Sequence, residues 1–338
     1  MKKNYLFFLI VGIAGLYSCQ KKIDAIKEKD SFIVAEESLL SGALNVYVAG
    51  SEDRMGFIAT YWKNGHPFPL TNGALPSFGE AMFVYGTTVY VAGELSDGFV
   101  ARATYWKNGQ AVYVSSADQD AYAYSIAVSG SDVYVAGYQN GSGPGTYAKY
   151  WKNGKAVTLS DGSQNASLQS IVVAGKDLYV AGYDGKVAKY WKNGHPVALT
   201  NGSKTAAANS IFIFNNDVYV AGYDGNTAKY WKNGHPVSLT NGAHEANANS
   251  IFVSGNNVHV AGAEKNGTHI IAEYWKNGHL VPLTNGSEDA IAYSVVVDYS
   301  NNVYVAGSRT SGANYWKNGI FVPLANGKRA TSIFLSHQ

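Results

Sequence analysis

Short apolar runs alternate with polar turn residues along most of this 338-residue chain. Between residues 205 and 242 the runs are Ser210–Phe214, Val218–Gly222, Thr227–Lys232 and His235–Thr240, and Asn, Asp or Gly residues separate them. Each run holds β-branched and aromatic residues over about 5–6 positions, which is typical of strands. No stretch beyond the N-terminal segment has a sustained helical period with caps. The pattern therefore predicts an all-β protein.

Two short motifs recur seven times, and their spacing indicates the architecture. The motif Tyr-Trp-Lys-Asn-Gly contains all seven tryptophans, and a second motif, (Val/Leu)-(Tyr/His)-Val-Ala-Gly, precedes each copy. Successive tryptophans are 44, 45, 40, 40, 44 and 41 residues apart. Four-stranded propeller blades have this length, roughly 40–45 residues, and the strand-like runs argue against helical repeats of similar length. We therefore expect a seven-bladed β-propeller of four-stranded blades.

The turns and the prolines order the strands within a unit. Asn-Gly follows the third run of every unit, as at Asn64-Gly65, and it is the strongest short signal for a type I′ hairpin because both residues accept positive φ. Proline cannot donate to a β-ladder and belongs on an edge strand. Six of the eight prolines fall in the fourth run. We therefore expect the fourth run at the outer edge of each blade and the Ser-Ile-Phe type of run innermost.

The closure of the ring can also be read from the repeats. Six units begin with a run of the Ser-Ile-Phe type, but the first unit begins directly at Val46. The missing innermost strand recurs at the C-terminus as Ser332–Ser336. Pairing of this segment with the first blade would close the ring and remove the exposed edges of an open array. Ser31–Val34 is an alternative for the same position, although the repeated turn motif is missing there.

With the segment Ser300–Gly307 and its equivalents in view, the chain resembles bacterial seven-bladed β-propeller repeat proteins, whose repeats carry a similar Gly-Asn-Val-Tyr-Val-x-Gly motif. The resemblance extends over residues 45–338. It implies the propeller fold, but a fold shared by many functions implies no particular activity. WD40 proteins are less similar, since no unit contains a Trp-Asp dipeptide. No motif of an enzyme family matches.

The N-terminus has the form of a bacterial lipoprotein signal. Met1–Lys3 carries positive charge, and Leu6–Leu16 is apolar but shorter than the roughly 20 residues of an ordinary membrane span. Leu16–Cys19 has the form of a lipobox. Cys19 is the sole cysteine, so it has no partner for an internal disulfide and is the expected lipidation site. A plain secretory signal with an incidental cysteine is the alternative.

These features divide the chain into three parts. We expect a lipoprotein signal peptide at 1–19, a charged tether at 20–40 and the propeller at 41–338. Lipidation on Cys19 predicts a protein anchored to the outer membrane of the bacterial cell envelope. The sequence does not distinguish the periplasmic side from the surface-exposed side.

Overall charge excludes one class of partner. Lysine and arginine number 26 against 24 aspartate and glutamate, a net charge of +2, and no basic field is large enough to indicate nucleic acid. No phosphate-binding loop, nucleophile elbow or EF-hand-like aspartate array is present. We expect no cofactor, a monomer, contact with the membrane through Cys19, and an envelope protein or a glycan as partner.

Four histidines, His66, His195, His235 and His279, directly follow the Asn-Gly turns. A metal ion needs its ligands within about 2 Å of it. Equivalent turns on different blades lie far apart around a ring, so we expect no metal site.

Carboxylates are the residues that most directly raise the question of catalysis. Three pairs fall in predicted loops: Glu52 and Asp53, Asp118 and Asp120, and Glu288 and Asp289. Two carboxyls about 5–10 Å apart can hydrolyse glycosidic bonds. Loops are also where solvated charge normally lies. We therefore expect no catalytic residues.

The repeated Tyr-Trp pair could be an aromatic binding platform or a core element. Neighbouring residues of a strand point to opposite faces, so the tyrosine and the tryptophan would contact different adjoining blades. Each aromatic side chain buries roughly 150–250 Å². We therefore expect the seven pairs to form the core between blades.

Ligand recognition is then left to the parts that differ between units. The loops between the second and third strands, and between blades, emerge on one face; they include 94–100, 138–146, 263–269, 115–124 and 284–292. One polar or aromatic residue precedes the innermost run of each unit and would ring the channel mouth on that face: Glu80, Tyr124, Gln169, Asn209, Asn249, Tyr293 and Thr331. Loops on a rigid scaffold commonly carry recognition, although the set could also be ordinary wet surface.

Three functional hypotheses follow. The first is a non-catalytic binding or interaction propeller of the cell envelope. The second is a surface lipoprotein that binds or cleaves polysaccharide. The third is a passive scaffold that uses the blade rims. No feature of the sequence identifies the ligand.

Overall fold

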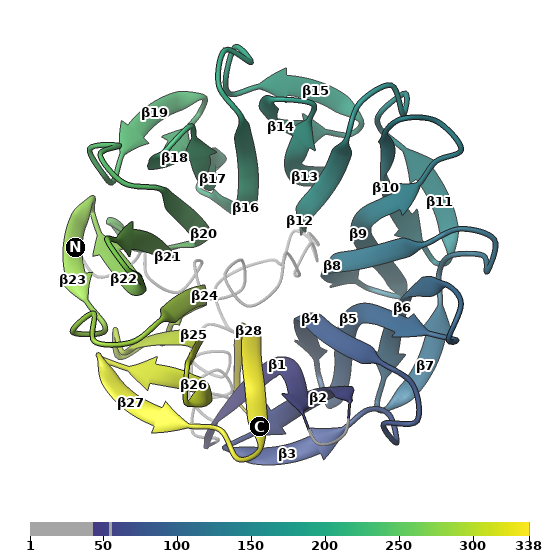
Figure 1. Ribbon diagram of the computed structural model, residues 1–338, viewed down its shortest axis with the longest axis horizontal. Coiled ribbons are helices and arrows are strands. Elements are labelled where there is room, and N and C mark those ends of the chain that lie inside the picture. Colours follow the sequence, from purple (N-terminus) through teal and green to yellow (C-terminus); the bar gives the residue numbers. More distant parts are fainter. Residues whose placement is uncertain (1–42, 54–55, 338) are drawn as a thin grey trace, which may run out of the picture.

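The computed structural model describes residues 43–53 and 56–337, which form a closed ring of seven four-stranded antiparallel sheets (Figure 1). This confirms the predicted seven-bladed β-propeller. Within the described part of the chain no helix is long and apolar enough to cross a membrane. The predicted signal peptide, Cys19 and the tether lie outside the described residues.

The strands run outward from the channel in each blade. The innermost strands are β28 (Gly327–His337), β4 (Ser77–Tyr85), β8 (Ala121–Ser129), β12 (Ala166–Ala174), β16 (Ala206–Phe214), β20 (Ala246–Ser254) and β24 (Ala290–Val297). The second strands are β1 (Leu44–Asp53), β5 (Thr88–Ser96), β9 (Asp132–Asn140), β13 (Asp177–Asp184), β17 (Asp217–Asp224), β21 (Asn257–Asn266) and β25 (Val303–Arg309).

The third strands are β2 (Phe57–Lys63), β6 (Ala101–Lys107), β10 (Thr146–Lys152), β14 (Val187–Lys192), β18 (Thr227–Lys232), β22 (His269–Lys276) and β26 (Gly312–Lys317). The outermost strands are β3 (His66–Pro69), β7 (Gln110–Tyr113), β11 (Lys155–Thr158), β15 (His195–Ala198), β19 (His235–Ser238), β23 (His279–Pro282) and β27 (Ile320–Pro323). Each outermost strand pairs only with the third strand of its blade. The prolines therefore lie on edge strands, as predicted.

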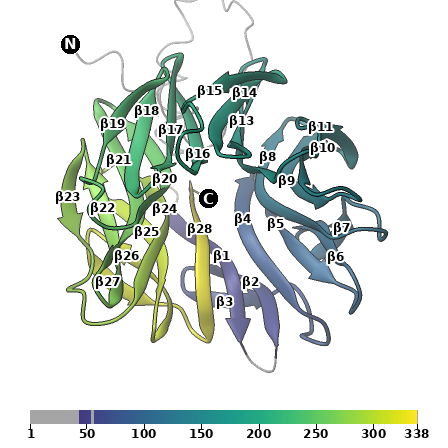
Figure 2. The same cartoon turned by 45° about the horizontal axis from the view of Figure 1, so that its top comes forward.

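The two ends of the described chain meet in blade 1, whose order is β28-β1-β2-β3. Strand β28 pairs antiparallel with β1, with Leu335 opposite Val46 and Ile333 opposite Val48. Figures 1 and 2 show β28 at the channel, between β24 and β4. Closure by Ser332–Ser336 is therefore confirmed. The alternative with Ser31–Val34 is wrong, because β28 occupies that position.

The Asn-Gly turns have the predicted conformation and an additional function. Asn193 and Gly194 have φ of 51° and 83°, which fits a type I′ turn. The Asn193 side chain also accepts a hydrogen bond from the backbone N–H of Leu178 at 2.8 Å. The equivalent bond is present in all seven blades. The asparagine of the first motif thus holds the first residue of the second motif.

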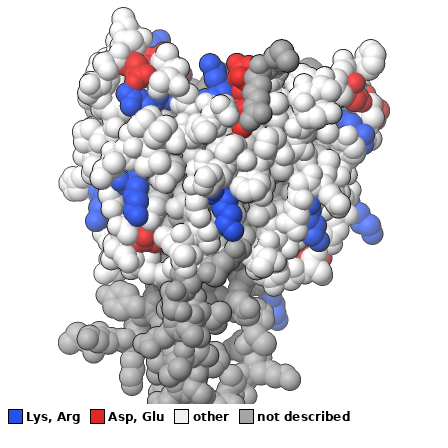
Figure 3. All heavy atoms as spheres, turned by 90° about the horizontal axis from the view of Figure 1, so that it is seen from below, with Lys and Arg blue, Asp and Glu red and all other residues white. Residues whose placement is uncertain are grey.

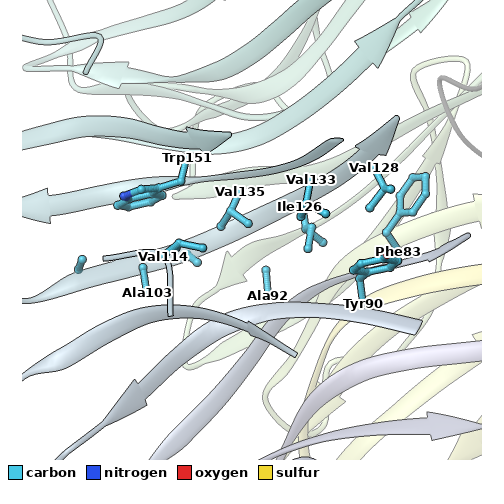
Figure 4. Packing of buried hydrophobic residues seen from close by; sticks show 12 residues of the cluster. Phe83, Tyr90, Ala92, Ala103, Val114, Ile126, Val128, Val133, Val135 and Trp151 are labelled. Atoms are coloured by element: carbon cyan, nitrogen blue, oxygen red, sulfur yellow. The ribbon is translucent and has the colours of Figure 1, made fainter. Parts of the chain in front are cut away.

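Seven hydrophobic clusters lie between neighbouring blades, and each contains one tryptophan. Figure 4 shows one of them, in which Trp151 of blade 3 lies near Val114 and Ala103 of blade 2, and Tyr90 and Phe83 of blade 2 lie at the other end of the cluster. The tyrosine that precedes the tryptophan, Tyr150, packs instead against the cluster shared with blade 4. Each tryptophan is at most 2% exposed. The interpretation of the Tyr-Trp pairs as inter-blade core is confirmed.

The outer wall carries dispersed charge. In most blades the lysine of the first motif lies over the tyrosine ring of the second, as Lys192 does over Tyr179, with Nζ 5.2 Å from the ring centroid. Lys192 also pairs with Asp177 at 2.8 Å. On the face shown in Figure 3, lysine and arginine side chains are spread among uncharged atoms. Such half-exposed pairs contribute little to stability.

Candidate functional site

A β-bulge interrupts every innermost strand at the same place. In β12, Leu168 pairs with Gly182 and Ser170 pairs with Ala181, so Gln169 has no partner in β13. A bulge of this kind adds one unpaired residue and re-aims its side chain. The seven bulged residues are Glu80, Tyr124, Gln169, Asn209, Asn249, Tyr293 and Thr331, the complete set predicted at the channel mouth.

The glycine of the second motif makes this bulge possible. A Cβ placed on Gly182 would collide with the backbone carbonyl oxygen of Ser167, on the neighbouring innermost strand. The corresponding glycine meets the corresponding carbonyl in all seven blades. Only a residue without a side chain allows this close approach of two strands. The repeated Val-Ala-Gly sequence is thus the local cause of the bulge that presents the candidate residues.

All seven bulged residues line one cavity of about 670 Å³ at the channel mouth. The structure thus brings the seven predicted residues together in one cavity, and their role in ligand binding stays a prediction. The lining also includes residues that the sequence analysis missed: Phe78, Glu94, Tyr122, Tyr223, Asn247 and Arg329. Four of these lie two positions before a bulged residue, so strand alternation could have identified them. Glu94 and Tyr223 are on second strands, opposite Phe78 and Ala207.

Three of the bulged side chains connect neighbouring blades. The Asn209 amide donates to the carbonyl oxygen of Ala248 at 3.0 Å, and the Asn249 amide donates to that of Ala292 at 2.9 Å. The Thr331 hydroxyl lies 2.9 Å from the carbonyl oxygen of Gly79. Each acceptor is the residue directly before the bulged residue of the following blade. These polar groups therefore help to fix the shape of the cavity as well as line it.

A ring of serine hydroxyls lies next to the bulged residues, and we call it the serine belt. Ser125, Ser170, Ser210, Ser250, Ser294 and Ser332 each accept a hydrogen bond from a backbone N–H of the next blade, at 3.1–3.3 Å. The seventh position is Ala81, which has no hydroxyl to offer to Ile126. The belt is therefore interrupted between blades 2 and 3, beside Glu80 and Tyr124.

One ion pair crosses the cavity wall between blades 1 and 2. Arg329 Nη1 lies 3.1 Å from Glu80 Oε1, and the Glu80 side chain is 12% exposed. The Arg329 guanidinium also lies over the Tyr293 ring, 4.7 Å from its centroid. Burial raises the pKa of Glu80, and the positive charge of Arg329 opposes that shift. The arginine is thus held by a carboxylate and an aromatic face at once.

Glu94 is the second carboxyl of the cavity. Burial and the neighbouring charge of Glu80 raise the pKa of Glu94 to about 8, while Arg329 opposes the shift. Its buried Oε2 atom has no hydrogen-bond partner among the described residues. The raised pKa favours the neutral form of this carboxyl near neutral pH, and a neutral carboxyl can donate a hydrogen bond.

Aromatic rings continue the wall beside the two carboxyls. Tyr122 stacks on Tyr138 with centroids 4.9 Å apart, and Tyr124 lies against the same ring at 5.8 Å. Burial raises the pKa of Tyr124, and Tyr138 and Glu94 add to the shift. The phenol groups of this wall are therefore uncharged near neutral pH.

The other residues singled out in the sequence do not converge. His66, His195, His235 and His279 begin outermost strands of four different blades. Within the described ranges, no group of three or more histidine, cysteine or acidic residues could hold a metal ion. His259 replaces a strand tyrosine, with Nδ1 2.6 Å from the Tyr274 hydroxyl.

Two of the three carboxylate pairs lie in loops and make local contacts instead of forming a shared site. The loop prediction is wrong for the third pair, because Glu52 and Asp53 are the last two residues of strand β1 and Glu52 is buried. Asp120 accepts a hydrogen bond from the backbone N–H of Ala101 at 2.8 Å. Glu288 pairs with Arg309, and Asp289 accepts from the backbone N–H of Ile270 at 2.9 Å. The two carboxyls that do share a cavity, Glu80 and Glu94, were not recognised as a pair because 14 residues separate them.

Neither the models of known protein families nor the curated proteins match this chain. Among solved structures, it is similar to a Bacteroides fragilis NCTC 9343 protein described as a candidate 6-phosphogluconolactonase. The two chains are 10% identical, with a TM-score of 0.49, over 86% of this chain and 98% of the other. A likeness at this level carries no argument about activity.

Proposed function

We propose that this protein is a non-catalytic binding propeller of the bacterial cell envelope, with its ligand or partner held on the loop face around the channel mouth. One observation carries the proposal: the seven bulged residues, one from each blade, line the same cavity of about 670 Å³. Small-molecule sites typically occupy ~300–1,000 Å³ and combine apolar walls with a few convergent polar groups. The aromatic rings, amides and carboxyls of this cavity fit that description.

The binding surface extends onto loops that are held together. In several blades the hairpin after the second strand is bonded to the loop that enters the blade; Gly185 N–H, for example, donates to Asn165 O at 2.9 Å. Phe99, at the tip of such a hairpin, is 95% exposed. Loops that differ in sequence but are fixed to a rigid ring suit the recognition of one specific partner.

The proposed location rests on the sequence alone. The apolar segment followed by Leu16–Cys19 supports cleavage and lipidation at Cys19. Expression of the full chain with an alkyne-labelled fatty acid should label the wild type and leave Cys19→Ser unlabelled. Label on the Cys19→Ser protein, or recovery of the wild type in the soluble fraction alone, would contradict a lipid anchor.

The binding role is tested by comparing matched variants. Partners or ligands captured by the full chain from envelope extract should be lost when Tyr124 and Tyr293 are both changed to alanine. Tyr85→Ala is the control, because Tyr85 ends β4 at the turn remote from the cavity. Capture that is equal for all three proteins would contradict a role for the channel mouth. An unchanged circular dichroism spectrum should accompany the loss.

The second candidate function is polysaccharide binding or cleavage at the cell surface. It is favoured by the presence of two carboxyls, Glu80 and Glu94, in a cavity with aromatic walls, since paired carboxyls carry out glycoside hydrolysis. Reducing-end assays on soluble polysaccharides decide between the candidates. Product formation that is lost in Glu80→Gln would replace the non-catalytic proposal.

A further inference from the structure

The cavity lining divides into two chemically different arcs. The first, which we call the charged-aromatic arc, consists of Tyr293, Arg329, Glu80, Glu94 and Tyr124. The second, the amide arc, consists of Gln169, Asn209, Asn247 and Asn249. Figure 1 shows that the innermost strands β24, β28, β4 and β8, which carry the first arc apart from Glu94 on β5, follow one another around the ring, and that β12, β16 and β20 face them. A ligand in the cavity would contact both arcs.

Formal charges in the cavity compensate one another. Arg329 is engaged by Glu80 at 3.1 Å and by the Tyr293 ring. Burial and the charge of Glu80 raise the pKa of Glu94 to about 8, which favours its neutral form near neutral pH. The amide arc carries no charge. A charged ligand would have to separate the Arg329–Glu80 pair in a partly buried site, which is costly. The lining therefore favours a ligand without net charge.

Several polar groups of the wall remain available for such a ligand. Glu94 Oε2 is buried and has no partner among the described residues. The amide arc both donates and accepts. A ligand with many hydroxyl groups matches this mixture of donors and acceptors.

We propose that the ligand of this cavity is a neutral saccharide, with hydroxyl groups bonded to the amide arc and to the Glu94 carboxyl and one ring face against Tyr124. This inference rests on the proposed binding function and names its ligand class. A cavity of about 670 Å³ accommodates a short oligosaccharide or the end of a longer chain. The aromatic faces of Tyr122 and Phe78 extend the apolar side of the same wall.

The first test measures binding to the full chain by calorimetry. The neutral probes are maltotriose, laminaritriose, mannotriose and xylotriose, and trigalacturonic acid is the acidic probe. At least one neutral probe should bind, and Tyr124→Ala should weaken that binding about tenfold or more. Tyr124→Phe, which keeps the ring face, and the remote control Tyr85→Ala should both retain it within about threefold.

The second test uses pH to examine Glu94 directly. Between about pH 7 and pH 9 the wild-type affinity should fall, because ionisation of Glu94 removes a donor and adds an uncompensated negative charge. Glu94→Gln should bind at pH 7 and show no such fall. The titratable groups that face Glu94 are Glu80 from its partner strand, Arg329 from β28, and Tyr122, Tyr124 and Tyr138 from blade 3.

The outcomes separate this inference from the function on which it rests. Absence of binding to all neutral probes, or stronger binding of trigalacturonic acid, would overturn the neutral-saccharide inference. If an envelope protein were still captured through the channel mouth, the proposed binding function would stand although the neutral-saccharide inference had failed. Binding followed by cleavage of a neutral probe would support the ligand class and refute the non-catalytic function.

Discussion

The hydroxyl of Ser170 accepts a hydrogen bond from the backbone N–H of Ile211, 3.2 Å away in the next blade. The bond connects the innermost strands β12 and β16, which belong to different sheets. Because the same bond recurs at six of the seven blade boundaries, the blades are joined by polar contacts at the channel as well as by the hydrophobic clusters between them.

The serine belt should contribute measurably to stability. Ser210→Ala removes the acceptor of the Ile251 N–H, and loss of one such bond costs about 1 kcal/mol of the free energy of unfolding. The converse variant Ala81→Ser completes the belt and should stabilise by a similar amount, about 0.5–1.5 kcal/mol. Urea denaturation measures both, with the exposed Ser238→Ala as control. Equal midpoints for Ser210→Ala and the control would refute this role.

The tryptophans should dominate the stability of the blade boundaries. Trp191 is 2% exposed and belongs to the same cluster as Ala136, Ala148 and Leu168, between blades 3 and 4. Trp191→Ala should therefore cost about 3–5 kcal/mol in the free energy of unfolding. Tyr190→Ala, at a half-buried position, should cost clearly less. A melting temperature that Trp191→Ala leaves unchanged would contradict the assignment of these residues to the core.

The turn asparagines combine two effects that glycine can separate. Asn193 has a φ of 51° and accepts the Leu178 N–H bond. Asn193→Ala should lose both, at a cost of about 2 kcal/mol, since an L-residue in the left-handed region costs about 1–2 kcal/mol. Asn193→Gly should lose only the side-chain hydrogen bonds, with Leu178 N–H and with Asp177 Oδ1, and be less destabilised. Thermal denaturation of the two variants checks the order, and equal losses would show that φ is immaterial here.

Stability should fall on the alkaline side because of a carboxyl pair in blade 6. Burial raises the pKa of Glu273 from 4.5 to about 8. The charge of Glu264 and a hydrogen bond between the two carboxyls add to this shift. A raised carboxyl pKa means that the folded state binds the proton more tightly than the unfolded state does. This contribution is complete below about pH 4.5 and is lost as the pH rises through about 8.

The melting temperature of the wild type should accordingly decrease between about pH 6 and pH 9. Glu273→Gln should reduce this decrease, because the glutamine remains neutral throughout. Glu94→Gln should act in the same direction, since the pKa of Glu94 is also raised to about 8. A wild-type melting temperature that rises over this range would contradict the predicted sign.

Those residues of the candidate site that occupy the same position in every repeat could be predicted from the sequence. The position before each innermost run is the same in every unit, so Glu80 and its equivalents could be assigned to the channel mouth before the structure. The pairing of Arg329 with Glu80 could not be predicted in this way, because the two residues are 249 positions apart. Glu94 was not singled out for a similar reason: its raised pKa results from burial and from the charge of Glu80, and no local pattern reports either.

The strands, the turns and the number of blades could be predicted from the amino-acid sequence, because they depend on local chemistry repeated seven times. Asn-Gly selects its turn through backbone φ, and proline marks edge strands through its missing N–H. Tertiary structure decided which side chains meet in the cavity. Closure by β28 brings Arg329 beside Glu80, and the bulges opposite glycines such as Gly182 turn one residue of each blade toward the axis.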